Sequence, residues 1–370
     1  MVFAMSLSQR EIVGLGLGTV IGTFDAPTFM IPVTSFSLQE VTTQIPDNGR
    51  RGPDAMDFRA VQGVKQFNIS IEGLVHPQGA TGFGVGLLLR NILNKVSVRT
   101  AFTTTALANN DFDLGIVKTY LSVEHRTRVT DKTRQVSGCR VSSLTFRWNA
   151  GEGALSYSAE LVGRKLALAT DAGLTDLTAQ VTALQDQFQG WRANVAFNAA
   201  LDHDAPNFAR MISSEWTLTR SLKPLWSGKS EQEYTDIYAG PLEAVVTMVL
   251  DYIDDTELAL YRAGSQIAII NKFQNLAPIT VATVPDTTMR RFLIGANVVS
   301  LLEAPAVLDS SGENVTLGIA GRCLYNEEAS KITLDPLIET ATVDDDKVFS
   351  PALNAGPIQL RLTDTRTTAY

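Results

Sequence analysis

Three histidines and two cysteines are the residues of this chain best suited to metal binding, acid–base catalysis or nucleophilic attack. His76, His125 and His203 lie far apart, and none has a second ligand at the spacing that zinc sites or catalytic pairs require. Cys139 and Cys323 form no Cys-x-x-Cys pair, which indicates free thiols in a reducing compartment. These side chains predict neither a catalytic group nor a metal site.

Two acidic clusters and a glycine-rich segment are the remaining candidates for a chemical motif. The clusters at 251–257 and 344–346 lack the spacing of a calcium-binding loop, and a helix start and a solvated loop account for them. Gly14, Gly16 and Gly18 match only part of the nucleotide-binding Gly-x-Gly-x-x-Gly turn. The sequence also has no Gly-x-Ser-x-Gly elbow and no Walker loop. We therefore predict no cofactor and no enzymatic activity.

Composition favours a globular protein that hides surface against copies of itself. A chain of 370 residues can form two domains of ordinary size. Charged residues make up 19%, fewer than the roughly 25% usual for soluble domains. The net charge of −8 argues against tight binding to a phosphate backbone. Prolines and an aspartate interrupt the apolar segment 12–33, and no signal peptide is evident, so we expect no membrane span and synthesis in the cytoplasm.

The elements that would position any functional residue follow one β-rich plan that occurs twice. Phe36 and Leu38 alternate with polar residues, as do Phe67, Ile69 and Ile71, which predicts half-buried strands. Each unit is a strand, a long polar loop and a second strand, followed by a short helix. The predicted ranges are 33–43, 45–62, 64–75 and 86–95 in the first half and 213–221, 223–240, 242–252 and 255–263 in the second. The two 18-residue loops are long for hairpins, which favours a shared functional role.

The rest of the chain is predicted to be mostly β-strands. Residues 1–34 are interpreted as an arm or edge strand and 97–112 as a loop. An apolar stripe over 170–189 predicts an amphipathic helix, interpreted as a connector. The predicted domains are therefore 1–170 and 191–370, with the helix at 171–190 between them. Further strands are predicted at 117–128, 136–147, 155–166, 192–198, 266–273, 292–302, 315–324 and 358–362.

The order and spacing of several segments resemble a known family. These segments are Gly22-Thr23, Ala26-Pro27-Thr28, Ile31-Pro32-Val33, Phe36-Ser37-Leu38, the loop 47–58, Gly63, the strand 67–73, the helix 87–93, Tyr120-Leu121-Ser122-Val123-Glu124, Ser137-Gly138-Cys139-Arg140-Val141 and the terminal Tyr370. Together they are similar to the tail tube proteins of long-tailed, siphophage-like bacteriophages, of the enlarged type with a duplicated tube domain.

The resemblance implies a mainly β fold of two tandem β-sandwich domains, each with a short helix. It implies that the inner sheets of three chains join into a β-barrel ring of pseudo-sixfold symmetry, and that rings stack into a tube that conducts DNA. The implied partners are further copies of the chain, the tape measure, terminator and distal tail proteins, and DNA in transit. The implied location is the virion tail, assembled in the host bacterial cytoplasm.

Two sets of residues are the candidates for these roles. If the hairpin strands line the channel, their polar faces supply uncharged or acidic side chains, and three chains at −8 each give −24, which repels a polyanion. The lumen-lining candidates are Gln39, Gln66, Asn68, Ser70, Glu72, Thr217, Thr219, Glu243, Thr247 and Asp251. The inter-ring loop candidates are Asp47, Asn48, Arg50, Arg51, Asp54, Lys229, Glu231 and Glu233.

The sequence leaves three other classes of protein to compare. A non-catalytic β-sandwich binding module of a baseplate or fibre is the main alternative, although it would be expected to cluster exposed aromatic residues. The four tryptophans, at 148, 191, 216 and 226, are instead scattered along the chain. An outer-membrane barrel lacks the expected signal peptide and lipid-facing pattern. An enzyme on a β scaffold has no acid–base pair or nucleophile that can be named.

Overall fold

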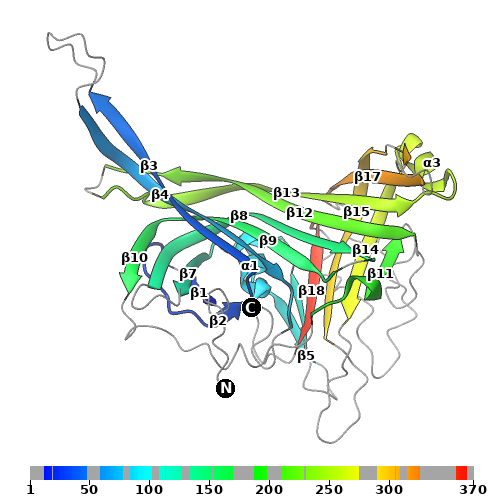
Figure 1. Cartoon of the computed structure of the whole chain (residues 1–370), viewed down its shortest axis with the longest axis horizontal. Helices are drawn as coiled ribbons and strands as arrows, with labels where there is room; N and C mark the ends of the chain where they lie inside the picture. The colour runs from blue at the N-terminus through cyan, green and yellow to red at the C-terminus, as the bar shows by residue number, and fades with distance from the viewer. Residues whose placement is uncertain are drawn as a thin grey trace, which may run out of the picture.

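The described part of the chain is mainly antiparallel β-structure (Figure 1). Its 18 strands belong to one hydrogen-bonded network, which confirms the predicted mainly β fold. The computed structural model describes residues 12–18, 20–47, 59–77, 84–101, 108–112, 114–126, 133–151, 153–169, 187–197, 210–228, 231–274, 290–304, 306–308, 315–325 and 356–364. The predicted connector helix at 171–190 falls mostly outside these ranges.

Eight long strands form the main sheet, and each neighbouring pair is antiparallel. In spatial order the strands are β3 (Ser35–Asp47), β4 (Arg59–Leu74), β9 (Ser156–Gly163), β8 (Thr133–Asn149), β12 (Met211–Leu225), β13 (Asp236–Asp251), β17 (Val315–Cys323) and β15 (Arg291–Glu303). The short β16 (Ala306–Leu308) continues the β15 edge along β17. We call β3 with β4 the first hairpin and β12 with β13 the second hairpin.

The N-terminal parts of β8 and β15 pair with a second layer of strands. β8 also pairs with β7 (Tyr120–Arg126) and β10 (Lys165–Ala169), and β1 (Ile12–Gly18) lies between β7 and β2 (Phe29–Ile31). β15 also pairs with β14 (Gln266–Gln274) and β18 (Gln359–Asp364), and β14 pairs with β11 (Asn194–Phe197). The pairing partners thus follow the same order in both halves of the chain.

One sequence prediction in this layer was wrong, and another was right only in part. The region 1–34, interpreted as an arm or edge strand, supplies β2, which pairs only with β1 among the described residues, but also β1, which has a partner on both sides and buries Val13 and Leu15 completely. The region interpreted as a loop at 97–112 contains β5 (Val98–Ala101) and β6 (Ala108–Phe112). β6 pairs with β18, so a polar segment becomes a strand because a distant part of the chain completes its hydrogen bonds.

The two hairpins share an irregularity at matching places. The β3–β4 register shifts between Thr42 and Gln44, and the β12–β13 register shifts between Arg220 and Leu222. Opposite these bulges lie Gly63 and Gly240. A Cβ atom at either glycine would come too close to the hydroxyl oxygen of Thr43 or Ser221 respectively, so a larger residue there would have to displace that hydroxyl.

Pairing continues beyond these bulges, which corrects the predicted loop lengths. β3 runs to Asp47 and β4 begins at Arg59, so the first loop is shorter than 45–62. β12 runs to Leu225 and β13 begins at Asp236, so the second loop is shorter than 223–240. Pro46, which suggested a turn, instead lies within β3, opposite Ala60 of β4.

Two short α-helices occur in the described residues, as the sequence predicts. α1 (Val85–Leu93) ends at Asn94, whose left-handed backbone (φ 55°) stops the helix while its N–H bonds to the Arg90 carbonyl. α3 (Thr256–Arg262) begins where an Asp254 carboxylate oxygen accepts a hydrogen bond from the Thr256 N–H at 3.0 Å. Neither helix is long and apolar enough to cross a membrane.

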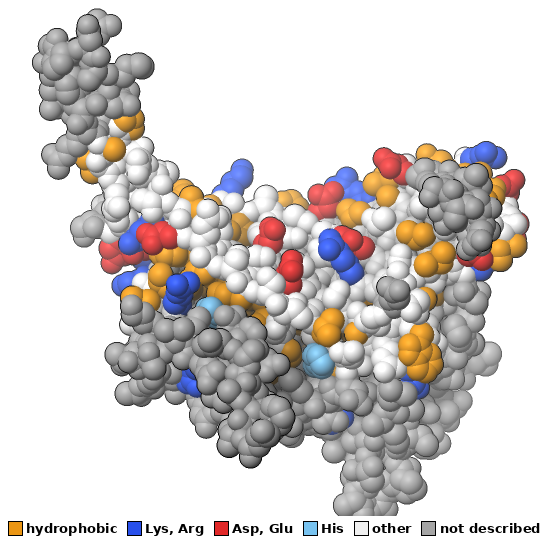
Figure 2. Space-filling model, in the orientation of Figure 1, with side chains coloured by type: hydrophobic (Ala, Val, Ile, Leu, Met, Phe, Trp, Pro, Cys, Tyr) orange, Lys and Arg blue, Asp and Glu red, His pale blue; other side chains and the backbone are white. Residues whose placement is uncertain are grey.

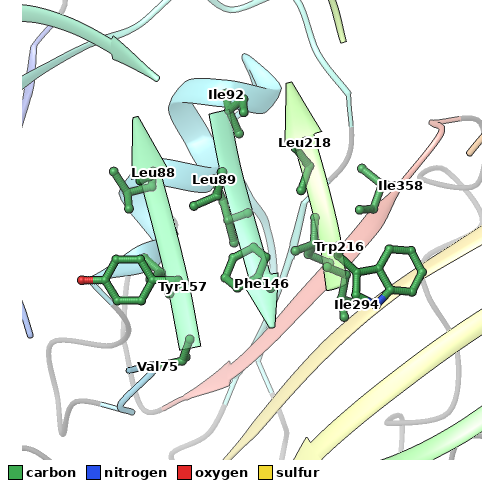
Figure 3. Packing of buried hydrophobic residues seen from close by; sticks show 14 of the residues in the cluster. Val75, Leu88, Leu89, Ile92, Phe146, Tyr157, Trp216, Leu218, Ile294 and Ile358 are labelled. Atoms are coloured by element: carbon green, nitrogen blue, oxygen red, sulfur yellow. The ribbon is translucent and has the colours of Figure 1, made fainter. Parts of the chain in front are cut away.

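A single buried cluster underlies both halves of the chain. α1 packs on β8, and its Leu88, Leu89 and Ile92 lie among side chains of the main sheet (Figure 3). Phe146 from β8 and Trp216 from β12, both fully buried or nearly so, meet beneath the junction of the two halves. The core is therefore continuous across the boundary between β8 and β12.

A buried ion pair connects the last strand to the first half of the chain. Arg361 on β18 donates two hydrogen bonds to the Asp111 carboxylate on β6, at 2.5 and 3.0 Å. Both side chains are at most 4% exposed. The bidentate geometry compensates two charges that would otherwise be costly to bury.

Removing one partner of this pair should destabilise the fold strongly. We expect Arg361→Ala to lower the free energy of unfolding by about 3–5 kcal/mol, because Asp111 would be left buried and uncompensated. Arg147→Ala, which breaks an exposed pair with Glu215, is the matched control and should cost less than about 1 kcal/mol. Urea denaturation followed by tryptophan fluorescence measures both. Equal losses for the two variants would contradict the role assigned to Arg361.

Candidate functional site

The side of the main sheet that faces away from the core carries mostly short polar side chains, and we call it the polar face. Strand alternation creates it: Thr217 and Thr219 alternate with the buried Trp216 and Leu218 on β12. The cross-strand register keeps equivalent residues side by side, as in Thr219 opposite Glu243. All ten lumen-lining candidates lie on this face, exposed or half-buried: Gln39, Gln66, Asn68, Ser70, Glu72, Thr217, Thr219, Glu243, Thr247 and Asp251.

The polar face runs without a break across the junction of the two halves, which we call the seam. The seam pairs residues 143–149 of β8 with residues 213–219 of β12. On the polar face the Arg147 guanidinium donates two hydrogen bonds to the Glu215 carboxylate, at 2.8 and 3.1 Å. The hydroxyls of Thr145 and Thr217 lie 3.3 Å apart beside this pair. On the core side the Trp148 indole donates to the Ser214 hydroxyl at 2.5 Å.

Several members of the polar face were missed from the sequence because only the hairpin strands were assigned to it. β8, β9 and β17 also contribute, with Arg147, Glu160 and Arg322 among their outward residues. The alternation of Thr145 and Arg147 with buried Leu144, Phe146 and Trp148 is the signal that would have found them.

Two exposed arginines of the polar face are held by carboxylates. Arg147 pairs with Glu215, and Arg322 pairs with Glu243 at 3.0 Å. Glu72 and Glu160 add acidic charge on the neighbouring strands. Figure 2 shows acidic and basic side chains beside one another among uncoloured polar groups over this region, with no large basic patch on the face in view. Such a surface offers no cluster of free cations to grip a phosphate backbone.

The tip of the second hairpin packs against the first half of the same chain. Tyr234 is completely buried, and its hydroxyl donates to the Gly138 carbonyl at 3.0 Å. Burial raises the pKa of this phenol well above its usual value. The Arg164 guanidinium bonds the Tyr234 carbonyl at 2.5 Å and the Glu231 carboxylate at 2.9 Å. Glu233 lies 3.6 Å from the Lys65 ammonium of β4.

A polar triad continues this docking at the base of the tip. The Asp236 carboxylate accepts hydrogen bonds from Lys118 at 2.6 Å and from the Tyr120 hydroxyl at 2.8 Å. Partial burial opposes ionisation of Asp236, but these hydrogen bonds outweigh it and lower the pKa of the carboxyl. Since the pKa is lowered by folding, the contact stabilises the docked tip above the usual aspartate range and weakens as the pH falls through the folded value.

The inter-ring loop candidates are only partly described. Glu231 and Glu233 make the contacts within the chain given above, and Asp47 ends β3. Lys229 and the first-loop residues lie outside the described ranges: Asn48, Arg50, Arg51 and Asp54. In Figure 1 the first hairpin extends away from the body of the molecule as a two-stranded ribbon. Equivalent hairpins therefore occupy two environments. The tip of the second hairpin is docked on the first half of the chain, whereas the first hairpin projects from the body of the molecule.

The main sheet ends in two open edges. Within the described residues β3 pairs only with β4, and the C-terminal part of β15 with β16 pairs only with β17. Unpaired strand edges expose backbone donors and acceptors that favour addition of another strand. The described residues bring together no group of three potential metal ligands.

These features are those of a β-sheet protein with open edges available for pairing with further strands. A family model for phage tail tube proteins matches residues 8–317, which is 310 of the 370 residues. The chain belongs to this family of phage tail tube proteins. The family is structural and non-enzymatic, so the chain is a component of the viral tail that assembles with itself and other tail proteins into a tube. No curated protein matches the chain.

Docking of the second hairpin tip should depend on Tyr234. Tyr234→Ala removes a fully buried ring, so we expect faster amide hydrogen exchange across residues 231–238 while the amides of the seam remain protected. Tyr234→Phe keeps the ring and loses only the hydrogen bond to Gly138, which should cost about 1 kcal/mol and leave exchange nearly unchanged. Exchange measured by mass spectrometry compares the two variants. Uniformly faster exchange over both halves in Tyr234→Ala would show that the contact is not local.

Proposed function

We propose that the chain is a duplicated tail tube protein of the siphophage type, and that three copies close a ring of pseudo-sixfold symmetry. Stacked rings form a hollow tube that conducts DNA during ejection. The two domains are 1–170 and 191–370, joined by a helical connector at 171–190. The proposal rests on the family membership together with the geometry of the two halves.

The observation that carries the proposal is the seam between β8 and β12. Here the two halves already join edge to edge by seven antiparallel residue pairs, from Ser213 opposite Asn149 to Thr219 opposite Ser143. Followed in one direction across the sheet, the strand order β3–β4–β9–β8 on one side of the seam is repeated as β12–β13–β17–β15 on the other. This repetition supports two copies of one domain. A ring needs only the repetition of this junction between chains.

The polar face is the surface that the proposal assigns to the channel. Its hydroxyl, amide and carboxylate groups hold water, and Arg147 and Arg322 are paired with carboxylates. A ring of three chains carries −24 in total, at −8 for each chain. A polyanion in such a channel is repelled overall and finds no cluster of free cations, so DNA can move through it.

The ends and the stacking of the tube require other contacts. We assign the loop between β3 and β4 to contact between stacked rings, since the first hairpin projects from the body of the molecule. The tape measure, terminator and distal tail proteins are the partners proposed at the tube interior and ends, with assembly in the host cytoplasm.

Electron microscopy of the purified protein at high concentration tests the ring. We expect rings with three chains and six similar lobes, or tubes built from them, because the open edges of the isolated chain become paired only on closure. Negative-stain class averages measure the symmetry, with dilute protein as the control for concentration dependence. Discrete monomers at every concentration would contradict the proposal and favour a binding module of a baseplate or fibre.

Deleting residues 48–58 should separate folding from stacking. Since β3 and β4 pair up to Asp47 and Arg59, a short Asn-Gly linker can close the hairpin and leave the sheet intact. We expect a variant with an unchanged thermal transition that forms rings but no long tubes. Shortening the second loop at 227–230, next to the residues of the tip that are docked within the chain, is the matched control and should leave stacking intact. Full-length tubes from the first-loop deletion would overturn the stacking role.

A further inference from the structure

We infer that the seam inside the chain is the template for the junction between chains, residue for residue. The open edge of β3 on one copy pairs with the β15–β16 edge of the next copy, in the register that β12 adopts on β8. Val41 of one copy then lies opposite Glu303 of the next. This inference rests on the proposed ring and adds to it the pairing that closes the ring.

Strand direction permits this junction without any rearrangement. The main sheet contains eight strands, and each is antiparallel to its neighbour from β3 to β15. With an even number of alternating strands, the two end strands run in opposite directions. β3 of one copy can therefore add to β15 of another as an antiparallel partner, as β12 adds to β8.

Two irregularities fix the register. In the first half a bulge separates Val141 from Ser143 on β8, and in the second half a bulge separates Leu301 from Glu303 on β15. Glu303 therefore occupies the position of Ser143, immediately after the bulge.

The hairpin bulges give the matching landmark on the other strand. Thr219 lies two residues before the bulge residue Ser221, and Val41 lies two residues before Thr43. Val41 therefore occupies the position of Thr219. Because Thr219 lies opposite Ser143 at the seam, the same pairing between copies places Val41 opposite Glu303.

The neighbouring position shows a complementary exchange of size. At the seam the buried Leu218 lies opposite Leu144. The corresponding residues at the junction are Glu40, which is exposed on the open edge, and Ala304, which is half-buried against the core. An acidic side chain on an open edge disfavours pairing with unrelated strands. Because Ala304 is smaller than Leu144, the Glu40 side chain meets less bulk at the junction than Leu218 meets at the seam.

The two open edges also carry exposed apolar side chains that a neighbour would cover. Ile45 and Val61, which are cross-strand partners on the first hairpin, are 62% and 52% exposed. Leu302, on the β15 edge, is 51% exposed. Apolar groups at both ends of one sheet are consistent with a second copy of the chain as the partner.

Cysteine cross-linking between single variants tests the register. Val41→Cys and Glu303→Cys proteins are mixed, assembled and oxidised, and disulfide-linked dimers are counted on a non-reducing gel. Opposite residues in an antiparallel pair have Cα atoms about 4.5–5.5 Å apart, within the range of a disulfide. In assembled protein, we expect most junctions that bring a Val41→Cys chain against a Glu303→Cys chain to form disulfide-linked dimers. Unassembled protein should form almost none.

Matched variants control for misfolding and for chance collisions. Ser143→Cys with Thr219→Cys in one chain should close a disulfide at the seam without assembly. A mixture of Ser37→Cys and Glu303→Cys displaces one cysteine by four residues, about 13 Å along β3, and should give no dimers. The native thiols should stay silent, since burial raises the pKa of Cys323 to about 12 and raises that of Cys139 still further.

The outcomes separate the register from the proposed function. Dimers from Val41→Cys with Glu303→Cys, and none from the displaced mixture, support the inference. Tubes or rings visible by electron microscopy in samples that give no dimers, or that cross-link only in the displaced mixture, overturn the register and leave the ring standing. Absence of any assembled particle in the wild-type protein overturns the proposed function itself.

Discussion

The seam between β8 and β12 is the constraint on which the rest of the structure depends. It turns the two halves into one sheet, and it places Phe146 and Trp216 over a core that neither half encloses alone. Hydrogen bonding fixes the register, and the Arg147–Glu215 pair marks it on the polar face. Because that ion pair is exposed, its contribution lies more in positioning than in stability. The buried contacts beneath it supply most of the free energy.

The two hairpins show how one element serves two environments. In the second hairpin Tyr234 and Ile237 are fully buried against the first half of the chain, with Leu222 packed beside them. At the corresponding positions the first hairpin carries Gln44 in place of Leu222 and Ala60 in place of Ile237, and both are exposed. An apolar tip is stable only where a partner surface is always present, as it is within one chain. In the proposed ring the first hairpin must remain soluble until a neighbour arrives, which explains its more polar character.

The sequence predicted what depends on local periodicity. Alternation at Phe67, Ile69 and Ile71 correctly identified the core side of β4, and both short helices were placed within a few residues. β6 was missed because its buried Asp111 has its partner, Arg361, 250 residues away in sequence, and no local pattern encodes that pair. The outer hairpin segments were read as loops because of residues such as Pro46. Proline has no N–H group, so it costs little stability at a strand position that donates no hydrogen bond to a neighbouring strand.

Charge on the polar face can be judged by comparing its arginines with its carboxylates. Arg147 and Arg322 are each satisfied by a cross-strand glutamate, whereas Glu72 and Glu160 have no cation directly opposite them, since Ser35, Ser158, Ser70 and Ser143 occupy the paired positions. The face therefore keeps excess negative charge although it contains arginine. In the proposed channel that excess acts over roughly one Debye length, about 10 Å at 0.1 M salt, and so reaches a duplex close to the wall. A surface that repels phosphate weakly at every level holds DNA at no particular position, which is the property that sliding through a tube requires.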